Sequence, residues 1–504
     1  MVDVERIDAN RLSIPGEIHA TVFANERVPV EEAAIEELRE LLTLAKTAES
    51  MWRADPGAFG ERPAVERVVL SPDFHKGAGI PIGTSLLTRG FCVPQAIGND
   101  VNCGVRLHAT SLDKERVEKN LDALEPRLRH IFFEGGRSIP LTRAQRVALL
   151  RDGLEGLLGE EAPDEGIWRQ LDAGQARRDL ARTRHRGRLE TQGIFGLEDY
   201  VARDDLTRDS QIGSIGGGNH FVELQWVSKV QGAAAHAWGL KPGRVVVMVH
   251  SGSVNVGHLC GGYFTGLVKE IYPRGLAHPR NGIFPLPAAS PAYPKFWSAL
   301  HNAAHFAWAN RFFLALLAHQ ALVETAGEHT FELVYDTPHN LAWRREDGAV
   351  LHRKGASPAG GIGEGCDAYH GEPVLVPGSM GAPSYVLEGL GSEEALRSAS
   401  HGAGRRLTRG AAAHGHGARG GAPAILDTDA ALDAFLREFR IVTPLDPRRA
   451  DVRRRADILG KWRQHLKEEA PWAYKDVRPV VETLEGAGIA RPVAELQPLL
   501  TLKG

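Results

Sequence analysis

Short apolar runs typical of strands alternate with longer helical stretches along most of this 504-residue chain. The strand-like runs, such as 68–70, 221–227 and 244–249, are rich in β-branched and aromatic residues. Apolar residues recur with a helical period over 29–51 and again over 296–327. Interleaved strands and helices predict a mixed α/β protein of the α+β class, with mixed sheets and surrounding helices.

The length corresponds to roughly three average domains, yet the sequence contains no repeat and no low-complexity linker. We expect residues 1–60 to form an N-terminal helical segment. Residues 61–504 are expected to form one large catalytic domain, because polar residues able to carry chemistry are spread over most of it. Within this domain 113–190 is predicted to be helical and Arg-rich, and a glycine-rich run at 414–421 is predicted to be a loop.

The net charge of the chain excludes binding of nucleic acid by overall electrostatic attraction. Lys and Arg total 60 and Asp and Glu total 63, which gives −3. Two local runs are basic: 177–188 has six arginines against one acid, and 437–455 has seven against three. Each run is either a solvated surface or a patch that contacts phosphates, and the sequence leaves both alternatives open.

The four cysteines, Cys92, Cys103, Cys260 and Cys366, form no C-x-x-C pair. The first residues lack the apolar core of a secretory signal. The apolar stretch 312–323 is interrupted by a histidine and a glutamine and is too short to span a membrane. We therefore expect a cytoplasmic protein without a membrane segment, whose thiols stay reduced.

A carboxylate and a thiol, Asp100 and Cys103, lie three residues apart in a glycine-flanked turn. Together with imidazole they would suit Mn, Zn, Fe or Co better than Mg or Ca. A thiolate can also bridge two ions. The alternative is an ordinary turn with a buried cysteine.

Three histidines lie where a predicted strand begins or ends. His220 follows a glycine run and Asn219, His250 ends a very apolar strand, and His339 follows another strand. A single histidine of this kind is usually structural, but three of them with the Asp-x-x-Cys turn favour a metal site held by rigid strands. The glycine run also allows a phosphate to approach the backbone closely.

Two glycine-rich turns near the C-terminal end carry reactive side chains. The turn at 377–385 presents the hydroxyls of Ser379 and Ser384. The turn at 400–405 places His401 beside Arg405, which is either a helix end with a capping glycine or a nucleophilic imidazole next to a cation for phosphate. Lys503, the penultimate residue, would by itself be read as frayed.

Taken together, these segments resemble the RtcB-type RNA ligases from about residue 73 to residue 504. The resemblance rests on motifs at 73–77 (Asp-Phe-His-Lys-Gly), 98–106, 216–223 (Gly-Gly-Gly-Asn-His-Phe-Val-Glu), 250–253, 306–311, 335–340, 352–356, 377–381, 401–405 (His-Gly-Ala-Gly-Arg) and 503–504. Their number and common order make chance negligible.

The resemblance implies an enzyme that uses GTP and two Mn²⁺ ions. It would join RNA ends bearing a 2′,3′-cyclic phosphate or 3′-phosphate to 5′-hydroxyl ends, in tRNA splicing or RNA repair. Guanylate would first be attached to His401, then pass to the RNA 3′-phosphate, and the 5′-hydroxyl would displace it. Broken tRNA or other cleaved RNA is the expected partner, with an archease-like activator, and the expected state is a monomer.

The resemblance also assigns roles residue by residue. The metal ligands would be Asp100, Cys103, His220, His250 and His339, with Cys103 bridging. Asn219 and Arg405 would meet phosphate. The groups for guanine would be Glu223, Ser384 and Lys503, with Ser379 nearby and Tyr474 stacking on the base.

Three departures from the family pattern affect the expected function. Val254 stands where the family usually has an arginine after the His-Ser-Gly-Ser motif, and 357–360 (Ser-Pro-Ala-Gly) replaces Thr-Arg-Ala-Phe. His305 replaces an asparagine. The sequence thus indicates a divergent paralogue, for which two alternatives stay open: a guanylyltransferase that caps 3′-phosphate ends without efficient sealing, and a non-catalytic, metal-containing RNA-binding protein.

Overall fold

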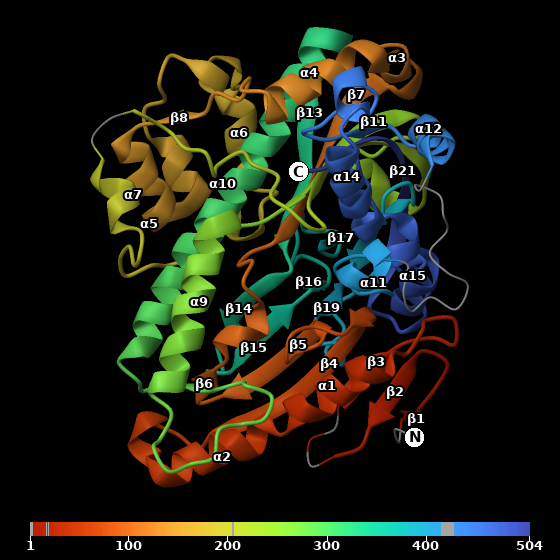
Figure 1. The fold of residues 1–504 in the computed structure, drawn as a ribbon. Helices are drawn as coiled ribbons and strands as arrows, with labels where there is room; N and C mark the ends of the chain where they lie inside the picture. The colour runs from red at the N-terminus through yellow and green to blue at the C-terminus, as the bar shows by residue number, and fades with distance from the viewer. Residues whose placement is uncertain (1–3, 17, 19, 204–205, 415–427) are drawn as a thin grey trace.

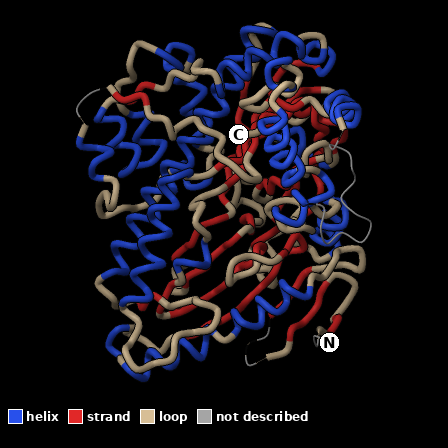
Figure 2. Tube along the Cα trace, in the orientation of Figure 1, coloured by secondary structure: helices blue, strands red, loops and turns tan. Residues whose placement is uncertain are grey.

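The computed structural model describes residues 4–16, 18, 20–203, 206–414 and 428–504. Strands fill the interior, while helices cover the left flank and the rim in the orientation of Figure 2. The mixed α/β class predicted from the sequence is confirmed. The glycine-rich run 414–421 was expected to be a loop. Beyond residue 414 this run lies outside the described residues.

One sheet of seven strands lies in the lower half of Figure 1. Its order is β1 (Glu5–Arg6), β2 (Arg11–Ile14), β3 (Ala20–Phe23), β4 (Ala64–His75), β5 (Ile82–Arg89), β15 (Val350–Lys354) and β14 (Asn340–Arg344). The N-terminal segment therefore carries three strands before its helices, and β3 pairs in parallel with β4. The sequence did not predict these three strands, because each has at most four residues and is too short to show an alternating pattern.

A second sheet of eight strands carries most of the strand-end residues. Its order is β13 (Phe331–Pro338), β7 (Gly104–Asp113), β11 (Arg244–Ser251), β10 (Phe221–Val230), β21 (Ala490–Leu502), β18 (Ser384–Gly389) and β17 (Pro373–Val376), with β20 (Ile441–Val442) beside β21. Three two-stranded sheets complete the set: β6 (Phe91–Cys92) with β12 (Leu286–Pro287), β8 (Pro140–Leu141) with β9 (Thr207–Arg208), and β16 (Ala356–Pro358) with β19 (Ser398–Ser400).

Helices pack around both sheets. The α-helices are α1 (Glu32–Leu42), α2 (Leu44–Ala54), α3 (Lys114–Glu118), α4 (Leu121–Phe133), α5 (Arg143–Gly159), α6 (Ala173–Leu180), α7 (Glu198–Ala202), α8 (Gly232–Ala237), α9 (Val254–Glu270), α10 (Ala292–Ala326), α11 (Arg409–His414), α12 (Asp429–Glu438), α13 (Ala450–Arg453), α14 (Ala456–Glu469) and α15 (Val477–Gly486). The 3₁₀ turns are η1 (Pro56–Ala58), η2 (Pro94–Ile97), η3 (Gly166–Gln170), η4 (Arg184–Gly187) and η6 (Pro471–Ala473). None of the described helices combines the length and apolar character needed to cross a membrane.

The longest helix, α10, runs through the interior beside α9 (Figure 1). It is apolar on all sides, which is typical of a buried helix. Several of its polar residues are buried and hydrogen-bonded, among them Asn302, Asn310 and Arg311. His305, which replaces an asparagine of the family pattern, accepts from the Leu189 backbone N–H (2.8 Å) and bonds the Leu150 carbonyl through Nδ1 (2.9 Å). It therefore connects α10 to α5 and to the segment after η4.

Most arginines of the two basic runs are neutralised within the chain. The ion pairs are Arg184–Glu372, Arg186–Glu155 and Arg188–Asp152 in the first run, and Arg440–Asp122, Arg448–Glu125, Arg449–Asp451, Arg453–Asp433 and Arg455–Asp457 in the second. These pairs favour the reading of the second run, and of Arg186 and Arg188 in the first, as solvated surface, whereas Arg184 is largely buried.

Candidate metal and nucleotide site

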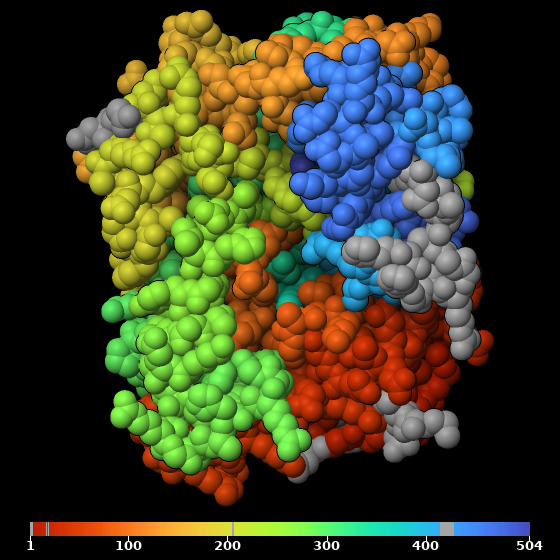
Figure 3. All heavy atoms as spheres, viewed as in Figure 1, coloured from red at the N-terminus to blue at the C-terminus, as the bar shows by residue number. Residues whose placement is uncertain are grey.

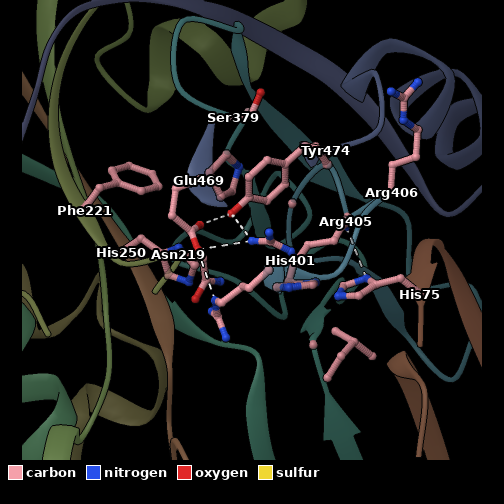
Figure 4. A pocket seen from close by; sticks show the side chains of 18 of the residues that line it. His75, Asn219, Phe221, His250, Ser379, His401, Arg405, Arg406, Glu469 and Tyr474 are labelled. Atoms are coloured by element: carbon pink, nitrogen blue, oxygen red, sulfur yellow. Dashed lines mark hydrogen bonds and ion pairs between the residues drawn. The ribbon is translucent and has the colours of Figure 1, made fainter. Parts of the chain in front are cut away.

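A cavity of about 500 Å³ lies where strand ends of the second sheet meet the turn around His401. The residues proposed from the sequence that line it are Asp100, Cys103, Asn219, Glu223, His250, His339, Ser379, His401, Arg405, Tyr474 and Lys503. His220 lines an adjoining cavity, and Ser384 lies behind Glu223. Figure 4 shows several of these side chains converging from elements far apart in the sequence.

The proposed metal ligands form two groups that share one thiol. Cys103 Sγ lies 3.2 Å from His220 Nε2 and 3.3 Å from His250 Nε2. On one side His220 Nε2 is 2.8 Å from Asp100 Oδ2, and on the other His250 Nε2 is 3.3 Å from His339 Nε2. The ligand atoms of each triad lie within 4.8 Å of one another. This arrangement can hold two cations with the thiolate between them.

The chemistry of these groups fits divalent metal ions. Burial, followed by the nearby His220, lowers the pKa of His250 well below its usual value. Burial, followed by the nearby His401, does the same for the pKa of His339. Both imidazoles are therefore neutral at pH 7 and can bind a metal ion. Burial and the nearby Asp100 raise the pKa of the Cys103 thiol. Asp100 Oδ1 is buried without a hydrogen-bond partner among the described residues. A bound cation would satisfy that oxygen and deprotonate the thiol.

Arg311 on α10 holds the ligand-bearing segments in place from behind. It is fully buried, and its Nη1 donates to the backbone carbonyls of Asn102 (2.6 Å) and Ser251 (3.1 Å). Its Nε donates to Asp336 Oδ1 at 2.9 Å. Each partner lies within three positions of a proposed metal ligand. Arg311 thus sets the relative positions of β7, β11 and β13 at the site.

His401 is oriented by a carboxylate from the first sheet. Its Nδ1 lies 2.5 Å from Asp73 Oδ2, and its backbone N–H donates to the same oxygen at 3.1 Å. Burial raises the pKa of Asp73, but the His401 imidazole and the Ser71 hydroxyl hold it below its usual value. A Cβ on Gly404 would lie 2.1 Å from the Asp73 carbonyl oxygen, so only glycine allows this close approach. With Nδ1 engaged, Nε2 is the nitrogen available for attack.

Glu223 is a buried carboxylate in the cavity lining. It accepts from the Thr501 hydroxyl and from Gln225 Nε2, each at 2.5 Å. Burial raises the pKa of Glu223 to about 7 despite these bonds. Ser384 Oγ accepts from the same Gln225 side chain (2.8 Å) and from the Gly378 N–H, so it supports Glu223 from behind.

Lys503 is ordered and buried rather than frayed. Its Nζ donates to the carbonyls of Gly218 (2.6 Å) and His220 (3.1 Å). The segment is fixed because β21 pairs with β10 up to Leu502. Burial lowers the pKa of Lys503 to about 8. The ammonium therefore anchors the glycine run that carries Asn219.

Glu469, at the end of α14, was not singled out from the sequence. Its carboxylate bonds Arg405 Nη1 (3.2 Å), Arg409 Nε (3.1 Å) and the Tyr474 hydroxyl. Arg405 also donates to the Tyr474 hydroxyl at 3.1 Å, and its guanidinium lies over the Tyr474 ring (Figure 4). Arg405, which was expected to meet phosphate, is thus held by Glu469 and Tyr474.

A second cavity of about 1600 Å³ adjoins the first at Asp100, Asn219 and Lys503. Figure 3 shows a hollow at the centre of this face, between the green α9 region, the orange N-terminal third and the blue α14 region. Val254 lines this cavity and has a left-handed φ of 50°, which is unusual for a β-branched residue. Lys354, Arg409 and Lys461 line the same cavity.

The chain is similar to known proteins over most of its length. The profile of the family described as tRNA-splicing ligase RtcB matches residues 60–421 and 446–504. A tRNA-splicing ligase RtcB of Thermococcus kodakarensis is 34% identical over 100% of this chain and 99% of its own length. One of Aeropyrum pernix is 30% identical over the full length of both chains. An RNA-splicing ligase RtcB of Mycobacterium bovis is 32% identical over 86% of this chain and 96% of its own length.

Proposed function

This chain belongs to the tRNA-splicing ligase RtcB family of RNA ligases, and on that premise we propose that it seals RNA through a guanylylated His401, with GTP and two Mn²⁺ ions. The substrates are an RNA end with a 2′,3′-cyclic phosphate or 3′-phosphate and an end with a 5′-hydroxyl. The observation that carries this proposal is the placement of His401 beside the cysteine–histidine cluster, 4.8 Å from the His339 ring between centroids.

We propose that Asp100, Cys103 and His220 hold one ion, and that Cys103, His250 and His339 hold the other. The shared thiol and the soft and imidazole donors support Mn²⁺ over Mg²⁺. The ions, when bound, neutralise phosphate charge. The protein supplies the rigid strand ends and Arg311, which keep the donors converged.

In the first step His401 Nε2 attacks the α-phosphorus of GTP and pyrophosphate leaves. Asp73 holds the other ring nitrogen and stabilises the imidazolium character that develops as the bond forms. Where the RNA ends in a 2′,3′-cyclic phosphate, water first opens the ring at the 2′-oxygen and leaves a 3′-phosphate and a 2′-hydroxyl. Guanylate then passes from His401 to the RNA 3′-phosphate. The 5′-hydroxyl attacks that phosphate, GMP leaves, and a phosphodiester is formed.

Selection of guanine over adenine rests on Glu223. As a carboxylate it accepts the N1–H and the 2-amino group of guanine, donors that adenine does not present on that edge. Ser379, Ser384, Lys503 and Tyr474 complete the proposed base site, with Asn219 on the phosphates. Arg405 reaches phosphate only after exchanging its bonds to Glu469 and Tyr474.

A second candidate function is guanylyl capping of 3′-phosphate ends without efficient sealing. The observation that favours it is Val254, an apolar residue at the wall of the adjoining cavity where the resemblance calls for an arginine. Loss of one charge-assisted phosphate contact costs about 1.5–3 kcal/mol.

The test is a joining assay with two RNA oligonucleotides, one ending in a 2′,3′-cyclic phosphate and one beginning with a 5′-hydroxyl, plus GTP and Mn²⁺. A joined product that requires GTP supports the ligase, and Val254→Arg should raise its yield if phosphate contact is limiting. A capped 3′ end without joined product supports the second candidate. Neither product, from protein with metal bound, contradicts both.

A further inference from the structure

A third cavity, of about 500 Å³, is lined by arginines and lies apart from the two described above. Its arginines come from η4, β14, the turn after β14, β15 and the segment before β19: Arg184, Arg344, Arg345, Arg353 and Arg397. Of its described lining residues, none lines the catalytic cavity or the cavity adjoining it. No step of the proposed function uses these residues.

Arg353 is a buried cation without a carboxylate partner. It is 4% exposed, and its Nε donates to Ser398 Oγ at 2.8 Å. Its Nη2 donates to the carbonyls of Leu396 (3.4 Å) and Arg397 (3.1 Å). Among the described residues no carboxylate lies within ion-pair distance of it. Burial and the neighbouring Arg184 lower the pKa of Arg353 to about 9. A bound anion would raise that pKa again, because it favours the charged form of the guanidinium.

Three of the four carboxylates that line the cavity already pair with its arginines. Glu372 accepts from Arg184 and from the Tyr335 hydroxyl, and Glu364 pairs with Arg397. Asp347 lies within ion-pair distance of Arg345 at 3.6 Å, while Glu346 is exposed. Five arginines thus face four carboxylates, and the buried Arg353 is among the arginines left without a carboxylate.

Two further arginine groups support an anion site. Arg344 lies over the Trp297 ring at 5.0 Å and has no ion pair among the described residues. The Nε of Arg184 is buried and has no hydrogen-bond partner among the described residues. Guanidinium groups match the oxygens of phosphate in charge and in geometry.

Strained backbone is concentrated at this cavity and at the catalytic site. Among the described residues, the non-glycine residues with positive φ are Asn102, His185, Arg186, Val254, Leu396 and Arg397. Asn102 precedes Cys103, and Val254 lines the cavity beside the metal ligands. The other four form two pairs, and three of the four line the arginine cavity. Strain of this kind persists mainly at ligand and active sites. Leu396 and Arg397 are also the residues whose carbonyls hold Arg353.

We propose that this arginine cavity binds a phosphate group, carried either by a free nucleotide or by the backbone of the RNA strand. The RNA source rests on the proposed function, whereas binding of a free phosphate does not. Failure of ligation would therefore leave the site itself testable.

The test is calorimetric titration of the whole protein with inorganic phosphate. Arg353→Gln should weaken the binding at least tenfold, and Arg344→Glu, at an exposed position, should weaken it several-fold. Arg491→Gln is the matched control, because this arginine pairs with Glu388 outside the cavity. His401→Ala should leave the same binding in place, which separates it from phosphate held in the catalytic cavity.

Two further titrations identify the source, one with GMP and one with a ten-nucleotide RNA that has hydroxyl ends. GMP binding that weakens in Arg353→Gln and Arg344→Glu assigns a free nucleotide. RNA binding that weakens in both variants, without a matching loss for GMP, assigns the strand backbone. Equal phosphate affinity in the wild type and both cavity variants, or no binding of any of the three probes at millimolar concentration, overturns the proposal.

Discussion

Asp73 Oδ2 and His401 Nδ1 lie 2.5 Å apart although the residues are 328 positions apart in the chain. The contact joins the end of β4 in the first sheet to the turn after β19. It holds the imidazole of the cavity-lining His401 at Nδ1, which leaves Nε2 as the other ring nitrogen for chemistry. A nucleophilic histidine gains most from such a partner when the partner also stabilises the cationic ring formed during attack.

Replacing this carboxylate by an amide tests its role. Asp73→Asn keeps the shape but removes the charge, so we expect guanylylation of His401 to slow by about 10² or more. Single-turnover labelling with GTP measures the rate. Ser71→Ala, which removes the Ser71 hydrogen bonds to Asp73 and to the Gly83 carbonyl but keeps the Asp73 carboxylate, is the control and should lose much less. Equal rates in Asp73→Asn and wild type would show that the contact is merely structural.

Arg311 should control metal affinity without touching metal. Arg311→Lys keeps the positive charge but loses the fork that holds Asn102 and Asp336 together. We expect Mn²⁺ affinity to fall by about 10- to 100-fold, as for other residues that orient ligands. A Mn²⁺ titration of guanylylation measures this, and excess Mn²⁺ should restore the rate. An unchanged midpoint, or a loss that Mn²⁺ does not restore, would contradict the positioning role.

Glu223 should make nucleotide binding depend on pH. Its pKa is raised to about 7, so the carboxylate form that accepts two guanine donors predominates only above that pH. GTP affinity should therefore rise as the pH increases from 6 to 8. Equilibrium titration over that range checks it. Glu223→Gln should bind more weakly and lose this dependence, and a wild-type profile as flat as that of the variant would count against the assignment.

Metal binding should release a proton from Cys103. Burial and Asp100 keep the pKa of this thiol high in the metal-free protein, so it is protonated at pH 7, whereas a metal ligand is the thiolate. Calorimetry in buffers of different ionisation enthalpy should reveal about one proton released per protein. Cys103→Ser should abolish most of the release and weaken binding. An enthalpy independent of the buffer would refute the thiolate assignment.

The sequence predicted the α+β class, the family and the strand-end positions of the three histidines, because each leaves a local pattern. It also predicted the long helix to within four residues at its start. The N-terminal strands were missed because they are too short to show alternation. Neither basic run revealed that some of its arginines pair with distant acids, such as Arg186 with Glu155 and Arg440 with Asp122, since those partners meet only in the fold.

Long-range partners were equally out of reach. Asp73 lies in a motif, but nothing in its neighbourhood indicates His401 as its partner. Glu469 lies in no motif used for the resemblance, and its bonds to Arg405 and Tyr474 depend on how α14 packs. The sequence showed Arg311 only as part of a motif. Its role in positioning the ligand-bearing segments follows from its contacts with three of them.

The most direct measurement is covalent labelling of the purified protein with radiolabelled GTP and Mn²⁺, followed by denaturing electrophoresis, with His401→Ala alongside. Guanylylation of His401 predicts an acid-labile, base-stable label on the native protein and none on the variant. No label on native protein with metal bound, or an equal label on His401→Ala, would contradict guanylylation of His401.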